Sequence, residues 1–244
     1  MCVNEWVTDS PDPRPPQPLE EAAAGLFGDR LSLAVRYAEL LMTDGEVRGL
    51  IGPREAPRIW DRHLLNCAVI GELIPQAARV VDVGSGAGLP GMVLAIARPD
   101  LSVTLIEPLA RRTAFLTEAV AELGLAAVTV VRSRAEEPPA RDLDPADVVV
   151  ARAVAPLDRL MTWCLPLAAE GGRVLALKGE SASDEIAEHA SAVAALGGGP
   201  AAVHRCGEGI IEPAVTVVEV TRERILMPRS RPEQARPRAA RRRR

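Results

Sequence analysis

Residues 80–91 read VVDVGSGAGLPG, an apolar run that carries one acid, Asp82, and then passes through four glycines. Glycine has no Cβ and tolerates positive φ, so glycines at this density let the backbone approach a ligand closely. A dinucleotide fingerprint, G-x-G-x-x-G/A, does not fit, because its third small residue would be Leu89. A carboxylate repels a pyrophosphate and attracts an ammonium or sulfonium group. The stretch therefore predicts a ligand with a cationic amino-acid part.

A second acid stands at the end of the next apolar run, LSVTLIEP, where Glu107 follows Gly84 by 23 residues. An acid at the end of the second strand of a parallel sheet can accept both hydroxyls of a ribose. The third run is followed by RSRAEE, and there Ala135 and Glu136 would lie over an adenine edge, although a solvated charged loop accounts for them equally well. The combination predicts S-adenosylmethionine as the cofactor. The residues that this reasoning places at the cofactor are Asp82, Gly84, Gly86, Gly88 and Glu107.

These acids and glycines need parallel strands whose carboxyl ends meet. From residue 79 onward, short apolar runs alternate with amphipathic segments, which is the pattern of βαβ units. The last two runs have no helical segment between them and predict an antiparallel hairpin. The predicted fold class is therefore α/β, a Rossmann-like, seven-stranded, mostly parallel sheet. The expected strands are 79–83, 102–107, 128–132, 147–151, 173–178, 201–206 and 216–221, and the expected helices between them are 90–97, 109–123, 157–167 and 183–196.

The first 76 residues show a different pattern. Residues 1–18 hold five prolines and no apolar periodicity, which predicts a disordered lead-in. Helical periodicity covers about 19–27, 30–42 behind Asp29 as the N-cap, and 56–73. We therefore expect a small helical cap at 19–76, a sheet domain at 77–222 and a disordered basic tail at 223–244.

Charge is divided unevenly along the chain. Residues 222–244 hold ten arginines and two glutamates, a net charge of +8, whereas the remaining residues hold 19 basic and 31 acidic groups, a net charge of −12. Such a tail is typical of an arm that contacts phosphates, and equally of a solvated low-complexity end. Lys178 is the only lysine beside 28 arginines, which indicates either that a compact ammonium is required there or that the lysine survived by chance.

Several other classes of protein are disfavoured. No run approaches the ~20 apolar residues of a membrane helix, and the first residues lack the basic and apolar regions of a signal peptide. The four cysteines are scattered without a CxxC motif, so we expect no disulfide framework and a cytoplasmic location. His63 with Cys67 is a conceivable start of a metal site, as is His204 with Cys206, but buried cysteines and hydrogen-bonded histidines are commoner, and we expect no metal. No long apolar stripe remains unassigned, so we expect a monomer.

The motifs together resemble a known family. DVGSGAGLPG, RHLLN at 62–66, LARRTAFL, SRAEE, ARAVAPL and LALKG occur in the order and spacing of the ribosomal RNA small subunit methyltransferase G family, also called glucose-inhibited division protein B. The resemblance extends from about residue 31 to residue 220. It implies a class I S-adenosylmethionine-dependent fold and methyl transfer to N7 of a guanine in the decoding region of 16S ribosomal RNA, with S-adenosylhomocysteine as the product. The implied partner is 16S rRNA or the small ribosomal subunit, with no membrane.

The resemblance also implies roles for individual residues. It implies that Arg152 and Lys178 are catalytic by positioning a phosphate and the guanine O6 atom, whereas the rival interpretation of Arg152 is an ion pair at a strand end. The chain departs from the family at LLMTDGEVRGLIGPRE, where Asn-Leu-Thr is usual, and at Asn66, where Asp is usual. The implied cofactor contacts are Gly84, Leu89, Ala135, Glu136 and Arg152, and the implied RNA contacts are His63, Arg111, Arg112, Arg134 and Lys178.

Guanine N7 carries a lone pair and no proton, so its methylation needs no general base. VVVARAVAPL lacks the Asn/Asp-Pro-Pro-aromatic turn of enzymes that methylate exocyclic amines, and it lacks the Pro-Cys pair used on cytosine C5. Three alternatives stay open at this point. One is an S-adenosylmethionine-dependent methyltransferase of a small molecule or protein, and another is a non-catalytic RNA-binding assembly protein on the same fold. The third, a nucleotide-dependent dehydrogenase, is disfavoured by Leu89 and by the lack of a Tyr-x-x-x-Lys pair.

Overall fold

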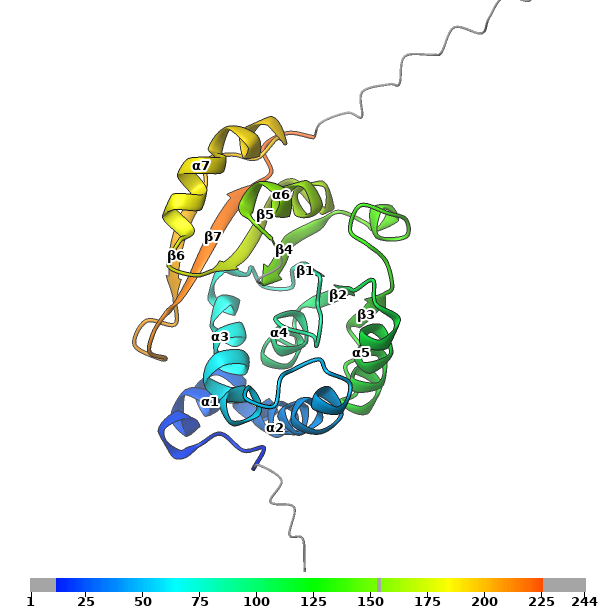
Figure 1. Cartoon of the computed structure of the whole chain (residues 1–244), viewed down its shortest axis with the longest axis vertical. Coiled ribbons are helices and arrows are strands. Elements are labelled where there is room, and N and C mark those ends of the chain that lie inside the picture. Colours follow the sequence, from blue (N-terminus) through cyan, green and yellow to red (C-terminus); the bar gives the residue numbers. More distant parts are fainter. Residues whose placement is uncertain (1–11, 153–154, 226–244) are drawn as a thin grey trace, which may run out of the picture.

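Seven strands form one sheet in the computed structural model, which describes residues 12–152 and 155–225 (Figure 1). The strand order is β3-β2-β1-β4-β5-β7-β6. Strands β1 to β5 pair in parallel, and β7 is antiparallel to both β5 and β6. The predicted fold class, with its closing hairpin, is confirmed. The strands are β1 Arg79–Val83, β2 Ser102–Ile106, β3 Val128–Val131, β4 Ala146–Arg152, β5 Ala168–Lys178, β6 Ala202–Cys206 and β7 Val215–Thr221.

Strands β1 to β4 and β7 form where the sequence has several β-branched residues close together. The central strands β1 and β4 are buried along almost their whole length, as parallel strands are when helices cover both faces of the sheet. Alternate residues of β4 enter different cores, with Val148 and Val150 in one and Val149 and Ala151 in the other. β5 begins five residues earlier than predicted, because Ala168 pairs with β4 ahead of a register shift.

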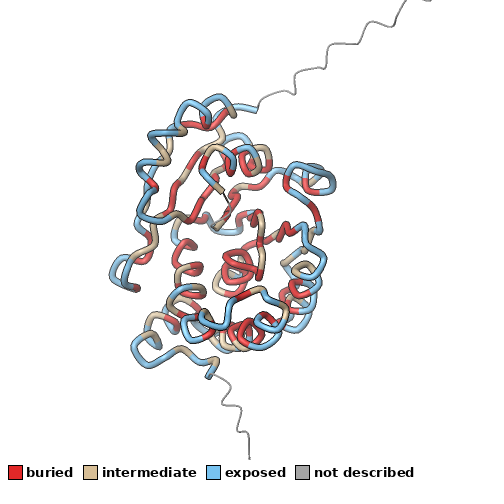
Figure 2. Tube along the Cα trace, in the orientation of Figure 1, coloured by how far each residue is buried: buried red, intermediate tan, exposed pale blue. Residues whose placement is uncertain are grey.

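Two groups of helices cover the two faces of the sheet (Figures 1 and 2). The cap helices share one core with α4 and α5, and α6 and α7 pack into the other. Among the helices of the described residues, none has the length and apolar character needed to cross a membrane. The helices are α1 Glu20–Phe27, α2 Leu31–Leu40, α3 Leu65–Ala68, α4 Gly91–Ala97, α5 Ala110–Glu122, α6 Leu157–Cys164 and α7 Ala182–Ala195.

The first two predicted cap helices form as α1 and α2, whereas the third is broken into short helical turns. The prediction that Asp29 caps α2 is wrong. Asp29 already lies inside a 3-10 turn, η2 (Gly28–Arg30), so it does not take the extended backbone of an N-cap, and α2 begins after Arg30 without a side-chain cap. α2 continues into a π-helical turn, η3 (Leu41–Gly45). The third predicted helix is a succession of η4 (Ala56–Arg58), η5 (Ile59–Leu64), α3 and η6 (Val69–Leu73).

The N-terminal segment that the structure describes packs against the cap. The indole N–H of Trp60 donates a hydrogen bond to the carbonyl oxygen of Pro13 at 2.9 Å. Residues Gln17–Leu19 form a short 3-10 helix, η1. Part of the predicted lead-in is therefore held by the cap, whereas residues 1–11 lie outside the described residues, as does the predicted tail from residue 226 onward.

A substitution at Leu94 tests whether α4 is packed between the cap and the sheet. It is fully buried, and α4 contacts β1 and β2 as well as the three cap helices. We expect Leu94→Ala to lower the free energy of unfolding by about 2–5 kcal/mol, because it removes buried methyl groups and leaves a cavity. The control is Val203→Ala on the edge strand β6, which is 44% exposed and should change that free energy by less than about 0.5 kcal/mol. Urea unfolding measures both variants, and equal losses would contradict this placement of α4.

Candidate functional site

The candidate site lies where the carboxyl ends of β1, β2 and β4 meet the loops that follow them. Two cavities open there, of about 230 Å³ and about 280 Å³, and both are lined by Gly84. The smaller cavity is bounded by the loops after β2 and β3 and by α6. The larger is bounded by the glycine turn, the cap loop at 50–55 and the end of β4. This edge of an open α/β sheet is where ligands bind.

Three glycines of the turn after β1 are in the left-handed region, with φ of 72° at Gly84, 60° at Gly86 and 98° at Gly88. Residues with a Cβ rarely adopt such values. At Gly88 the space is filled as well, because a Cβ there would stand 2.7 Å from the hydroxyl oxygen of Tyr37. Both conformation and packing therefore require glycine at this position.

A cap residue that the sequence reasoning missed supports the turn. Tyr37 is buried on α2, and its hydroxyl donates a hydrogen bond to the carbonyl oxygen of Ala87 at 2.6 Å. Burial raises the pKa of Tyr37, so the hydroxyl keeps the proton that it donates. The available signal was a single tyrosine on an apolar helix, because a buried phenol needs a polar partner.

Asp82 lies beneath the turn with its side chain fully buried. Its Oδ2 accepts a hydrogen bond from the backbone N–H of Gly91 at 3.0 Å, while its Oδ1 has no partner among the described residues. Burial raises the pKa of Asp82 from 3.8 to about 7, against the opposing effect of the Gly91 hydrogen bond. A buried carboxylate oxygen without a partner is costly, and a nearby cation relieves that cost. The site therefore fits a ligand with a positively charged group.

Glu107 is buried directly after β2 and also holds the glycine turn. Its Oε2 accepts from the backbone N–H of Gly86 at 3.0 Å, and its Oε1 accepts from that of Leu109 at 2.9 Å. Arg112 Nη1 stands 3.7 Å from Oε2. Because each carboxylate oxygen can accept two hydrogen bonds, both oxygens keep capacity for the ribose hydroxyls that the sequence predicts.

The smaller cavity has an apolar wall that includes Ile106 and the buried Ala135, with the exposed Glu136 among its lining residues. The predicted pair after β3 is thus placed at this cavity. Arg159 and Trp163 of α6 also line it, with the Arg159 guanidinium carbon 5.0 Å from the Trp163 ring centroid. The sequence reasoning missed both residues, because the pattern of α6 does not tell which loop lies beside it.

The larger cavity forms where the cap meets the sheet domain. The cap contributes Leu50, Ile51, Gly52 and Glu55 from the loop before η4. The predicted site residues that line this cavity are Gly84, Gly86, Leu89, His63, Arg112 and Arg152. Residues of the cap and of the sheet domain, separated by up to about 100 positions in the chain, are therefore brought to one space.

Arg152 and His63 contact each other at the larger cavity. Arg152 Nη2 lies 3.0 Å from His63 Nδ1, and Arg152 Nη1 lies 3.4 Å from the carbonyl oxygen of Arg62. On its other side His63 Nε2 lies 2.8 Å from Glu55 Oε2. Within residues 12–152 and 155–225, no carboxylate oxygen approaches the Arg152 guanidinium within 4.0 Å, so the rival interpretation of Arg152 as an ion-paired residue has no support there.

Lys178 ends β5 and is not among the residues that line either cavity. Its ammonium donates to the carbonyl oxygen of Ala155 at 2.8 Å and to Glu185 Oε2 at 2.7 Å, and the side chain is only 10% exposed. The contact with Ala155 ties β5 to the segment between β4 and α6. A catalytic or RNA-binding role for Lys178 stays a prediction.

The other arginines expected to face RNA lie at or near the rim of the two cavities. Arg134 is exposed and lines the smaller cavity, and Arg112 is half-buried and lines the larger. Arg111 is exposed and lies beside the cap loop at Gly49. The structure thus gathers these three basic side chains around one edge of the sheet.

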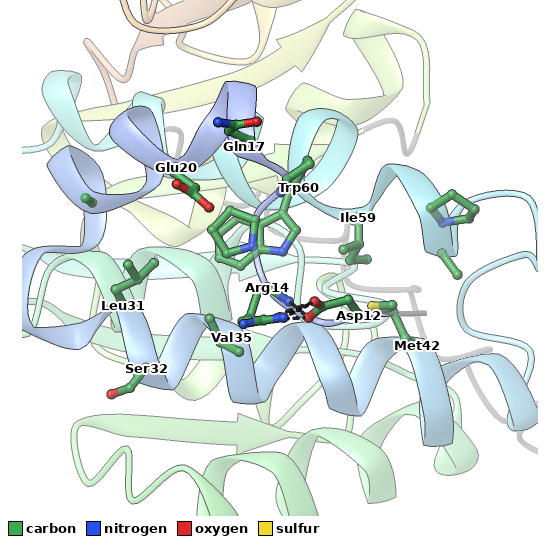
Figure 3. A pocket seen from close by; sticks show the side chains of 15 residues that line it. Asp12, Arg14, Gln17, Glu20, Leu31, Ser32, Val35, Met42, Ile59 and Trp60 are labelled. Atoms are coloured by element: carbon green, nitrogen blue, oxygen red, sulfur yellow. Dashed lines mark hydrogen bonds and ion pairs between the residues drawn. The ribbon is translucent and has the colours of Figure 1, made fainter. Parts of the chain in front are cut away.

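A third cavity, of about 940 Å³, is larger than either but is lined by none of the predicted site residues (Figure 3). It lies in the cap between α2, Trp60 and residues 12–20, and Asp12 and Arg14 pair with each other there. In the parts of the chain that the structure describes, no three side chains of His, Cys, Asp or Glu gather closely enough to hold a metal ion. The chemistry therefore favours the two smaller cavities as the site.

Comparisons with known proteins agree with this geometry. Residues 30–215 match the family model described as rRNA small subunit methyltransferase G. The chain is 67% identical over 235 residues to ribosomal RNA small subunit methyltransferase G of Salinispora tropica, covering 94% of this chain and 97% of that protein. It is 56% identical over 207 residues to the protein of the same name from Mycobacterium marinum, covering 84% and 90%.

Among solved structures, an S-adenosylmethionine-dependent O-methyltransferase from Thermotoga maritima shares the fold, with a TM-score of 0.51. The sequence identity is 15%, and the match covers 67% of this chain and 66% of that one. At this low identity, the similarity shows a shared architecture of sheet and helices and nothing more.

The raised pKa of Asp82 gives a prediction about stability and pH. The folded protein holds a proton on Asp82 between about pH 4 and 7, where the unfolded chain does not, so this carboxyl makes the folded state less stable as pH rises through that range. Asp82→Asn keeps an acceptor for Gly91 and cannot titrate. We expect the stability advantage of wild type over this variant to shrink between pH 4.5 and pH 8 in urea unfolding.

Asp100→Asn is the matched control for this experiment. The hydrogen bond from Arg98 lowers the pKa of Asp100 to about 2, so its contribution to stability is lost only at pH values below about 4. The difference between wild type and this variant should stay constant between pH 4.5 and pH 8. If the free energies of unfolding of wild type and Asp82→Asn change with pH in the same way, the raised pKa of the buried Asp82 carboxyl is contradicted.

Proposed function

The chain belongs to the rRNA small subunit methyltransferase G family, and from this premise we propose that it transfers a methyl group from S-adenosylmethionine to N7 of a guanine in the decoding region of 16S ribosomal RNA. The observation that carries the proposal is the pair of cavities that meet at Gly84, beside two buried carboxylates and Arg152. One cavity suits a nucleoside, and the other leaves space for an acceptor. The small ribosomal subunit in the cytoplasm is the proposed partner.

The residues present fit S-adenosylmethionine. A cation close to Asp82 favours the ionised form of this carboxyl, whose unpartnered oxygen suits the cationic amino-acid part, and the Glu107 oxygens suit the ribose hydroxyls. The apolar wall that includes Ile106 and Ala135 suits the adenine, with Glu136 beside it. When bound, S-adenosylmethionine supplies an electrophilic methyl group on its sulfonium.

The chain's own task in this reaction is placement. Guanine N7 has no proton to remove, and His63, whose two ring nitrogens already face Glu55 and Arg152, is not needed as a base. Arg152 and Arg112 face the larger cavity and can donate to the guanine O6 atom or to a neighbouring phosphate. Because N7 methylation leaves positive charge on the base, we assign these cations to O6 and phosphate rather than to the ring itself.

Lys178 has a positioning role in this proposal. The Lys178 ammonium pairs with the Glu185 carboxylate and donates a hydrogen bond to the carbonyl oxygen of Ala155. It thereby holds the segment that follows Arg152. A lysine suits this position because one compact ammonium donates to both acceptors. A planar guanidinium is bulkier and presents its N–H groups in a fixed geometry. The single lysine of the chain is thereby accounted for.

Glu107→Gln tests the cofactor site. The amide loses one acceptor oxygen, turns an N–H group toward a backbone N–H of Gly86 or Leu109, and removes the charge. We expect the Kd of S-adenosylhomocysteine, measured by titration calorimetry, to rise about tenfold to a hundredfold, as for the loss of charged hydrogen bonds. Glu118→Gln, on the exposed face of α5, is the control and should leave this Kd unchanged. A Kd within twofold of wild type for Glu107→Gln would contradict the ribose assignment.

Transfer of labelled methyl to small ribosomal subunits that lack the modification tests the reaction itself. We expect the label in 7-methylguanosine after digestion of the RNA. Arg152→Gln should lower kcat/KM by about a hundredfold, because it removes a charged donor from the acceptor cavity. The control is Arg205→Gln on the edge strand β6, which is separated from β1 by three strands of the sheet. It removes the same charge and should leave kcat/KM unchanged. Label in protein, or in another nucleoside, would overturn the proposal.

A further inference from the structure

We propose that Glu55 is a positioning residue for the methyl transfer, and that it acts through His63 on Arg152. The inference rests on the proposed function, which it deepens by naming what orients the arginine at the acceptor cavity. The three side chains come from three separate places in the chain: the cap loop, η5 and the end of β4. All three line the larger cavity.

The contacts form a relay with one consistent hydrogen-bond direction. Glu55 Oε2 lies 2.8 Å from His63 Nε2, and His63 Nδ1 lies 3.0 Å from Arg152 Nη2. A carboxylate only accepts and a guanidinium only donates. His63 Nε2 therefore donates to Glu55, and Nδ1 accepts from Arg152. Both partners select the same neutral tautomer, and the Glu55 carboxylate thereby favours the form of His63 that can hold Arg152.

The relay orients Arg152 without neutralising it. Other arginines of the fold, such as Arg98 with Asp100 and Arg173 with Glu219, pair directly with a carboxylate. Within the described ranges, the polar neighbours of Arg152 are the His63 ring, the Arg62 carbonyl oxygen at 3.4 Å and the Cys67 sulfur at 3.8 Å. None of these carries a negative charge when the histidine and the thiol are neutral. The full positive charge of Arg152 thus stays available to an acceptor in the cavity.

The surroundings make the relay sensitive to acid. Burial and the charge of Arg152 lower the pKa of His63, the hydrogen bond to Glu55 opposes them, and Arg62 adds to the lowering. Burial raises the pKa of the Cys67 thiol to about 11, so that neighbour stays neutral. Arg112 is the other charged residue lining this cavity. A proton on Nδ1 would face the Arg152 N–H group, so protonation of His63 breaks the contact.

The tautomer of His63 tests the relay in the protein alone. Protein labelled with ¹⁵N-histidine has only three histidines, and His63→Asn assigns the His63 signals by their loss. In wild type, we expect Nε2 to carry the proton and Nδ1 to be bare, with a pKa below 6.5. In Glu55→Gln, we expect a mixture of tautomers and a still lower pKa, because the amide can present either oxygen or N–H and has no charge.

The control is Arg62→Gln, which removes the other partner of Glu55, an ion pair of 3.0 Å. It leaves the Glu55 contact to His63 in place, so the Nε2–H tautomer should be retained. A tautomer and pKa of His63 that are the same in Glu55→Gln as in wild type would overturn the relay. A loss of the Nε2–H tautomer in Arg62→Gln would also overturn it, because the ion pair and not the relay would then orient the ring.

Methyl transfer tests whether the relay positions Arg152. Glu55→Gln should lower kcat about tenfold to a hundredfold, as displacements of a reacting group do, while the Kd of S-adenosylhomocysteine stays within about twofold of wild type. The acid limb of its kcat profile should move to lower pH together with the pKa of His63. In His63→Asn, the amide oxygen can accept from Arg152 in place of Nδ1. This variant should therefore keep part of the wild-type rate and lose the acid limb.

The outcomes separate this inference from the proposed function. Normal kcat in Glu55→Gln, or an acid limb that does not follow the pKa of His63, would overturn the positioning role. If wild type itself transfers no methyl group to small subunits, the proposed function fails, and the role of Glu55 in transfer fails with it. The tautomer experiment would still decide in that case whether Glu55 controls the His63–Arg152 contact.

Discussion

The hydrogen bond between the buried Asp82 carboxylate and the backbone N–H of Gly91 is the constraint on which the rest of the site depends. It joins the end of β1 to the first residue of α4. A Cβ at Gly91 would stand 2.8 Å from Asp82 Oδ2, so the strand and the helix approach as closely as the backbone allows. The chain between them must then close in a tight turn through left-handed glycines. Gly84 of this turn lines both cavities.

The cap completes the site rather than merely covering the sheet. Tyr37 supports the glycine turn from α2, and the cap loop supplies Glu55 opposite the end of β4. The larger cavity therefore needs the docked cap. Because cap and sheet share one apolar core, the free energy that docks the cap also assembles this cavity.

Electrostatics divides the work of binding between buried acids and exposed bases. Asp82 and Glu107 lie beneath the turn, where low dielectric strengthens their attraction for a cation and their hydrogen bonds. Arg111, Arg112 and Arg134 lie at or near the rim, in a body whose net charge is otherwise negative. The proposed RNA recognition therefore rests on this local basic edge. Arg152 belongs to this edge, is held by a neutral histidine, and has no carboxylate oxygen within 4.0 Å among the described residues.

The sequence by itself determined most of the strands, the parallel βαβ units and the glycine turn, because these follow from local chemistry: apolar runs, glycine density and acids at the ends of the first two strands. By family resemblance it also indicated Arg152 as a cofactor contact and His63 as an RNA contact. Only the tertiary structure decided that Glu55 and Arg152 meet at His63, that Tyr37 reaches Ala87, and that Lys178 turns to Ala155 and Glu185. Most of these contacts join residues far apart in the chain, and their geometry depends on how the cap, the sheet and the loops pack, which no local pattern encodes. The short helical turns that replace the predicted cap helix at 56–73 have the same cause, since packing against α4 and the sheet overrides the helical periodicity of these residues.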